Sequence, residues 1–142
     1  MIDDIYGVID KKPFHIFALL LLFLNIAGVG ENPNYLTILS LIGSLVSIII
    51  SIVMKFYFKT GRPQHNKYRV IPYGFPSGHA HVIFTVATIY SYYTPVLAAP
   101  LFLFALFVSV SRLKVKAHTL RDVMAGLMLG LFTGLVTIIL AG

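Results

Sequence analysis

The chain has 142 residues, of which 58% are apolar and 11% are charged, and it contains no cysteine, which excludes disulfides and thiolate chemistry. Soluble domains are about 45–50% apolar, and one domain of this length could not bury so much apolar surface, so residues 1–142 are predicted to form a single integral-membrane domain. A net charge of +6 would suggest nucleic acid in a soluble protein, but here the basic residues cluster at the ends of apolar runs, which favours membrane lipids as partners and no nucleic acid.

Five apolar runs follow one another along the chain, at residues 14–29, 36–58, 79–93, 96–110 and 120–140. The second and fifth runs approach the roughly 20 residues that span a bilayer as a helix, and the other three are nearer 15. The predicted fold is therefore all-α, a polytopic membrane helix bundle of about five transmembrane helices.

The fifth run carries Gly126, Gly130 and Gly134, one every four residues. A stripe of small residues lets two helix backbones approach closely in a membrane. We expect this stripe to pack within the monomer, with a homo-oligomer contact as the alternative.

If five helices alternate in direction, the segments 59–76 and 111–119 and the N-terminus lie on the same side of the membrane. All eleven Lys and Arg residues then lie on that side, and the opposite side has only Glu31 among its charges. Four helix ends bring polar residues to this face: Lys55 and Arg62, then Ser77, Gly78 and His79, then Ser111 and Arg112, and finally His118 and Asp122.

These residue types predict a site for a phosphate-like anion. The N-termini of the helices that begin near Ser77 and His118 present free N–H groups and the positive end of a dipole. Arg62 and Arg112 can each bind two phosphate oxygens through a planar guanidinium, and Lys55 adds a point charge. Glycine, as at position 78, allows an oxygen to approach the backbone.

Two histidines supply chemistry beside this anion site. His118 and Asp122 are four residues apart, so on a helix they share a face. A carboxylate that holds one imidazole nitrogen fixes the tautomer and leaves the other nitrogen free to attack. His79 comes from a different helix and can protonate a leaving oxygen. We expect His81, about 200° further around that helix, to lie outside the site.

Three segments also match a known pattern. "KFYFKTGRP" (55–63) fits K-x6-R-P, "PSGH" (76–79) fits a second motif, and "SRLKVKAHTLRD" (111–122) fits S-R-x5-H-x3-D. Together they resemble the type 2 phosphatidic acid phosphatase family (PAP2), although many membrane members have six spans and a larger loop before the first motif. The resemblance implies a phosphate cage and a catalytic group. The cage is Lys55, Arg62, Ser77, Gly78 and Arg112; the catalytic residues are His118 as nucleophile, Asp122 as its partner and His79 as general acid.

The resemblance also implies the reaction. It indicates a hydrolase, acting on phosphoric monoesters or diphosphates, that passes through a phosphohistidine and uses no metal or other cofactor. Because a bundle of this size has no room for a soluble cap, we expect a membrane lipid as substrate. Candidates are a polyprenyl diphosphate, such as a dolichyl or undecaprenyl diphosphate, and a phosphatidic-acid-like lipid.

Two other functions use the same residues. A metal-dependent membrane hydrolase could coordinate its ion with His79, His118 and Asp122, although three cations would then face the metal. A transporter or flippase for anionic lipids could use the basic site without turnover, but it has no need for a His–Asp pair four residues apart.

Two features of the sequence favour opposite sides of the membrane for the site. The basic residues outside the cage favour a cytoplasmic site by the positive-inside rule, whereas many members of the family act on the outer face. The chain is expected in the cell membrane as a multi-pass protein. The basic residues outside the cage that favour the cytoplasmic side include Lys59, Lys67, Arg69, Lys114, Lys116 and Arg121.

Overall fold

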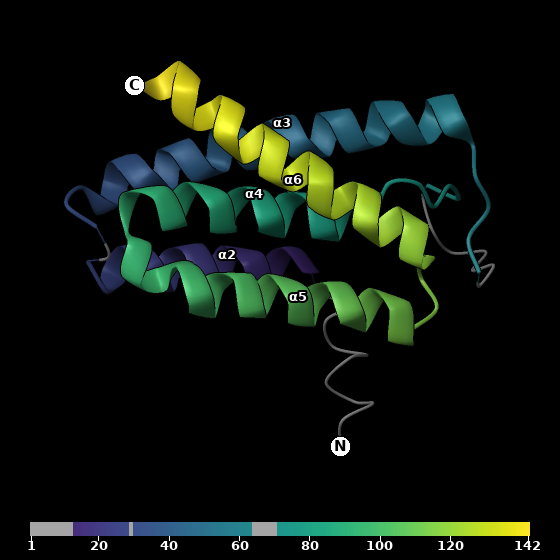
Figure 1. Cartoon of the computed structure of the whole chain (residues 1–142), viewed down its shortest axis with the longest axis horizontal. Helices are drawn as coiled ribbons and strands as arrows, with labels where there is room; N and C mark the ends of the chain where they lie inside the picture. Colours follow the sequence, from purple (N-terminus) through teal and green to yellow (C-terminus); the bar gives the residue numbers. More distant parts are fainter. Residues whose placement is uncertain (1–12, 29, 64–70) are drawn as a thin grey trace.

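The computed structural model describes residues 13–28, 30–63 and 71–142. Within these ranges the chain is helical and has no strand. The elements are α2 (Pro13–Ile26), α3 (Pro33–Phe58), α4 (Gly78–Tyr93), the 3-10 turn η1 (Pro95–Leu97), α5 (Ala98–Lys114) and α6 (Leu120–Ala141). The helices lie side by side, roughly along the long axis of the molecule with α6 tilted across the others, and they alternate in direction (Figure 1). The predicted all-α bundle is confirmed, and the main difference is that the fourth helix continues beyond residue 110 to Lys114.

Among the described residues, three segments are long and apolar enough to cross a bilayer: Pro33–Phe58, Pro95–Lys114 and Leu120–Ala141. Their outward faces carry large exposed apolar side chains, such as Leu45 on α3 and Phe132 on α6. In a soluble protein such faces would mark interfaces, whereas here they suit the hydrocarbon of a membrane.

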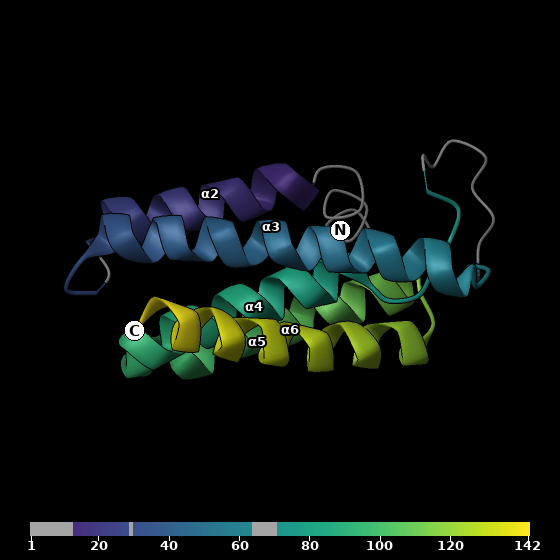
Figure 2. The same ribbon diagram turned by 90° about the horizontal axis from the view of Figure 1, so that it is seen from above.

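The short helix α4 lies inside the bundle. Its 16 residues rise about 24 Å, less than the roughly 30 Å of a bilayer core. Every residue from Ile83 to Tyr90 is buried, and α3, α5 and α6 all pack against it. Because protein surrounds α4, its ends need not reach the membrane surface. It begins short of the end reached by α3, α5 and α6 (Figures 1 and 2).

The glycine stripe of α6 is the surface on which α4 rests. A Cβ added at Gly126 would lie 2.5 Å from the carbonyl oxygen of Ser77, and one at Gly130 would lie 2.6 Å from that of His81. At Gly134 it would lie 2.6 Å from Thr88 Cβ. The prediction that the stripe packs within the monomer is confirmed, and because α4 covers these glycines they present no open surface to a second copy.

Helix ends place the charged residues at one end of the bundle. The helices α3 and α5 end there, and α4 and α6 begin there, while Glu31 lies between α2 and α3 at the other end (Figure 1). The residues Lys11, Lys12, His65, Lys67 and Arg69 lie outside the described residues. The basic residues that are described all lie at the first end: Lys55, Lys59, Arg62, Arg112, Lys114, Lys116 and Arg121.

Candidate active site

The turn between α5 and α6 folds His118 back onto Arg112. The carbonyl oxygen of Arg112 accepts hydrogen bonds from the backbone N–H groups of Ala117 (3.1 Å) and His118 (3.3 Å). Lys116 turns the chain here with a left-handed φ of 50°. The six-residue spacing between the arginine and the histidine of the third motif therefore closes a compact turn, in which Arg112 is fully buried.

Asp122 faces His118 because of how α6 begins. Thr119 is the N-cap: its side chain accepts a hydrogen bond from the N–H of Asp122 (3.2 Å), and Asp122 Oδ2 accepts one from the N–H of Thr119 (2.9 Å). This capping box points the carboxylate back toward the helix start. His118 Nδ1 lies 3.6 Å from Asp122 Oδ2, longer than a formed hydrogen bond but in reach of one.

The predicted reason for this pairing was wrong in one respect. The sequence suggested that His118 and Asp122 share a helix face, but His118 precedes the N-cap and lies outside the helix. The capping box brings the two side chains together instead. Its signal, a threonine three residues before an acidic residue in "TLRD" (119–122), is present in the sequence.

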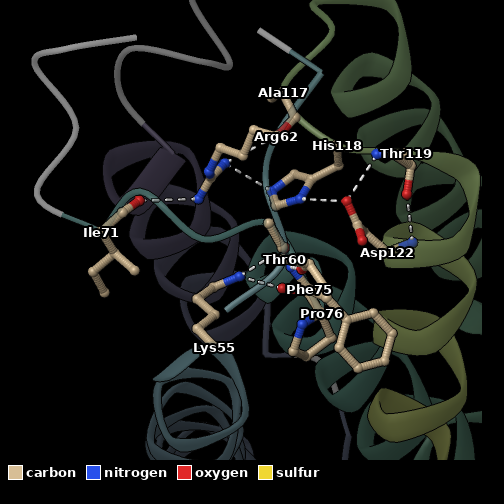
Figure 3. Close-up of polar contacts among 11 residues, drawn as sticks. Lys55, Thr60, Arg62, Ile71, Phe75, Pro76, Ala117, His118, Thr119 and Asp122 are labelled. Carbon is tan, nitrogen blue, oxygen red and sulfur yellow. Dashed lines mark hydrogen bonds and ion pairs between the residues drawn. The ribbon is translucent and has the colours of Figure 1, made fainter. Parts of the chain in front are cut away.

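Arg62 fixes the tautomer of His118. Its Nη1 lies 3.3 Å from His118 Nε2 and also donates to the carbonyl oxygen of Ala117 at 3.1 Å, while Nη2 contacts the carbonyl oxygen of Ile71 at 3.5 Å (Figure 3). A guanidinium only donates hydrogen bonds. His118 Nε2 must therefore be the acceptor, and the ring proton sits on Nδ1, facing Asp122.

The surroundings of His118 keep its ring neutral. Burial lowers the pKa of His118 from the ordinary 6.5 to about 4. The contact with Asp122 raises the pKa in part, and the charges of Arg62, Lys55 and Arg112 lower it further. A neutral ring whose Nε2 lone pair points toward the cations is the form that can act as a nucleophile.

Lys55 and Thr60 tie the end of α3 to the segment before α4. The buried Nζ of Lys55 donates to the carbonyl oxygens of Gly74 (3.0 Å) and Pro76. Thr60 accepts hydrogen bonds from the N–H of Gly74 at its carbonyl oxygen (2.9 Å) and from the N–H of Phe75 at its hydroxyl (3.0 Å). Sequence reasoning did not single out Thr60, although it lies inside the first motif between the lysine and the arginine.

Ser77 and Gly78 form the start of α4, beside α6. The N–H of Ser77 donates to the carbonyl oxygen of Asp122 at 2.9 Å, and Ser77 Oγ is buried without a hydrogen bond to the described part of the chain. A Cβ at Gly78 would meet only Ser51, at an ordinary 3.8 Å. Helix packing therefore does not require glycine at position 78.

His79 follows on the first turn of α4. Its Nε2 is buried and makes no hydrogen bond within the described ranges. The cationic side chains of Arg112, Lys55 and Arg62 lie close enough to its ring to act on its charge, and the ring of His118 is also near. The structure thus brings all eight predicted site residues to one place, at the junction of four helix ends.

Comparisons with known proteins identify the family and the fold. The sequence profile of the PAP2 superfamily matches residues 34–142. The chain belongs to the PAP2 superfamily. A similar solved structure is the crystal structure of a transmembrane PAP2 type phosphatidylglycerolphosphate phosphatase from Bacillus subtilis, with a TM-score of 0.74 at 19% identity over 99% of this chain and 76% of that chain. No curated protein sequence gives a significant match.

The alternative of a metal ion held by His79, His118 and Asp122 gains no support from the side chains of this PAP2 protein. Within the described ranges, no three His, Asp or Glu side chains are grouped so that they could hold a metal ion. Lys55 and Arg62 also lie close enough to His118 to act on its charge, which disfavours a cation at the same place.

The neutral state of His118 gives a testable pH dependence. In a ¹⁵N-histidine NMR titration of the substrate-free protein, the His118 resonance, assigned by its loss in His118→Gln, should titrate near pH 4. Between about pH 6.5 and about pH 4, His118 binds a proton in the unfolded chain but not in the folded one. His118 therefore lowers the free energy of unfolding as the pH falls through this range.

A matched variant tests the cause of the low value. Arg62→Gln removes a positive charge that lowers the pKa of His118, so the midpoint should rise. A midpoint at or above 6.5 in the wild-type protein would contradict the described surroundings of the ring.

Proposed function

We propose that this PAP2 protein is a membrane lipid phosphatase that works through a phosphohistidine and without a metal ion. The observation that carries the proposal is the arrangement around His118. Its Nδ1 faces the Asp122 carboxylate and its Nε2 faces the Arg62 guanidinium, so a phosphate held by Arg62 would meet the attacking nitrogen. The superfamily membership and the fold of a membrane PAP2 phosphatase support this function.

The first chemical step is attack of His118 Nε2 on phosphorus. The bond from phosphorus to the leaving oxygen breaks, and His79, which approaches from α4, donates a proton to that oxygen. A bound phosphate would accept hydrogen bonds from the Arg62 N–H groups that, without phosphate, contact His118 Nε2 and the carbonyl oxygen of Ala117. Lys55, Arg62 and Arg112 would stabilise the charge on the equatorial oxygens in the transition state.

The second step is hydrolysis of the phosphohistidine. Water attacks phosphorus, His79 accepts a proton from that water, and the bond to Nε2 breaks to release inorganic phosphate. Asp122 holds the Nδ1 proton and stabilises the positive ring of the intermediate. The buried hydroxyl of Ser77 and the backbone N–H groups at the start of α4 are the further donors available to the phosphate.

Removal of the nucleophile tests the mechanism. His118→Ala should lose phosphate release by roughly a thousandfold or more while its thermal unfolding in detergent stays cooperative. Tyr92→Phe, an exposed residue at the other end of α4, is a control that should keep wild-type activity.

Two inhibitors sharpen this test. Orthovanadate, which mimics the five-coordinate phosphorus, should inhibit the wild-type enzyme, and EDTA should leave its activity unchanged. Near-normal turnover by His118→Ala would overturn the assignment, and loss of activity in EDTA would favour the metal-dependent alternative. Tight lipid binding with no phosphate release would favour the transporter.

The substrate we propose is a lipid phosphate or diphosphate, either a polyprenyl diphosphate or a phosphatidic-acid-like lipid. The site lies at the end of a bundle whose outer faces are apolar, so it is level with lipid head groups rather than with bulk solvent. Aromatic side chains line the same end, among them Phe58 and Phe75, whose ring centroids are 5.0 Å apart.

A matched pair of substrates decides this point. Phosphate release from a long-chain lipid phosphate should exceed release from its short, water-soluble analogue at equal concentration in nanodiscs. A lipid monophosphate and a lipid diphosphate of the same chain then separate the two classes of bond. Faster turnover of the soluble ester would show that the membrane does not deliver the substrate.

For the membrane face, we propose that the site is cytoplasmic, because the described basic residues all lie at its end of the bundle. The chain has no native cysteine, so single cysteines report topology. Pro72 and Glu31 are exposed, and they lie at opposite ends of the bundle because Pro72 is between α3 and α4 and Glu31 is between α2 and α3. In intact cells, a membrane-impermeant maleimide should label Glu31→Cys and leave Pro72→Cys unlabelled. The reverse labelling would place the site on the outer face.

A further inference from the structure

One buried histidine has no part in the proposed mechanism. His81 is fully buried on α4, and both of its ring nitrogens contact hydroxyl groups of other helices. Nδ1 lies 2.8 Å from Ser51 Oγ on α3, and Nε2 lies 2.9 Å from Thr133 Oγ1 on α6. A neutral imidazole has one donor and one acceptor, and each hydroxyl can serve in either role. The ring is therefore a bridge between three helices.

This bridge is separate from the phosphate site, although His81 follows His79 by only two residues. The ring of His81 contacts Ser51 and Thr133, and neither of them belongs to the set of residues predicted to bind phosphate. Both nitrogens of His81 are engaged with hydroxyl groups, so the ring offers no free nitrogen to a metal or a substrate.

On the α3 side, the bridge lies one helical turn from Lys55. Ser51 precedes Lys55 by four residues, so the two side chains share a face of α3. Ser51 is also the side chain nearest to Gly78, at the start of α4. The contact between Ser51 and His81 therefore fixes how far α3 can slide along α4, and with it the point at which Lys55 Nζ meets the Pro76 carbonyl oxygen.

On the α6 side, the bridge supports the contact that holds the third motif against the second. Ser77 N–H donates to the Asp122 carbonyl oxygen, and Gly130 packs against the backbone of His81. Thr133 lies on the same buried face of α6 as Gly126 and Gly130. The hydrogen bond between Thr133 and His81 fixes the rotation and the height of α6 against α4.

A second polar layer joins the same helices one turn deeper. Thr85 Oγ1 lies 2.8 Å from Ser47 Oγ on α3 and donates to the carbonyl oxygen of Gly130 on α6, at 3.2 Å. Packing of apolar side chains inside a membrane gives little resistance to sliding, because lipid tails are equally apolar. Directional hydrogen bonds and small residues supply that resistance.

We propose that His81 is a positioning residue for the phosphate site: by bonding Ser51 and Thr133, it sets the mutual register of α3, α4 and α6. This register decides whether Lys55, the start of α4 and Asp122 face one phosphate. The proposal rests on the proposed function of the site. A misplacement of about 1 Å in such a site can cost roughly a hundredfold in rate.

The test measures the inhibition constant of orthovanadate, which does not depend on how much of the enzyme is folded. In nanodiscs, His81→Leu should raise this constant by about tenfold to a hundredfold and lower kcat. Thr133→Val keeps the side-chain shape and removes one hydrogen bond, so it should fold even if His81→Leu does not, and it should raise the constant less. The double variant should show less than the sum of the two effects, because both remove the same bridge.

Tyr90→Phe is the matched control. Tyr90 is also fully buried on α4 and contacts α3 through a hydroxyl, 3.4 Å from Thr37 Oγ1, but at the end of α4 away from the site. Its loss should alter thermal stability and leave the vanadate inhibition constant unchanged. His81→Gln, whose amide can both donate and accept, should recover part of the affinity that His81→Leu loses.

The outcomes are distinct. If His81→Leu and Thr133→Val lower stability but keep the wild-type inhibition constant, as Tyr90→Phe should, the bridge is only structural and the proposal is overturned. If the wild-type enzyme itself neither hydrolyses lipid phosphates nor responds to vanadate, the proposed function fails instead.

Discussion

The close contact between α4 and α6 is the constraint on which the rest of the structure depends. Gly126 and Gly130 let the two backbones approach so nearly that a methyl group at either position would collide with a carbonyl oxygen. This approach brings the carbonyl oxygen of Asp122 within reach of the N–H of Ser77. The second and third motifs, distant in sequence, therefore become neighbours because one helix face lacks side chains.

The shortness of α4 has its own consequence for the chemistry. Because α4 is enclosed by protein, it can begin below the level reached by α3, α5 and α6 (Figures 1 and 2). Its N-terminal end, with free N–H groups and a positive dipole, then faces the cations that the longer helices supply from around it. Burial is the main cause that lowers the pKa of His118, and the cations proposed to bind phosphate lower it further.

Polar side chains in this membrane protein divide between two tasks. Those at the helix ends, Lys55, Arg62 and Asp122 among them, meet at the proposed phosphate site. Ser47, Ser51 and Thr133 lie within the bundle and join helices. Lys55 belongs to both groups. It lies at the end of the buried face of α3 that also carries Ser47 and Ser51, and it bonds the segment before α4. The scaffold and the site therefore share one continuous polar face of α3.

The sequence by itself determined the helices, their alternation and the residue types of the site. Apolar runs of sufficient length form helices in a bilayer because each backbone group must be satisfied within its own segment. Alternation then places Lys55, His79 and His118 at one end. The capping box that turns Asp122 toward His118 is local, and its signal is present in the sequence. The tertiary structure alone decided the other contacts: the donor from Arg62 that fixes the tautomer and the bridge through His81 join segments many residues apart. No periodicity along the chain records such contacts, because they follow from the register in which the helices pack.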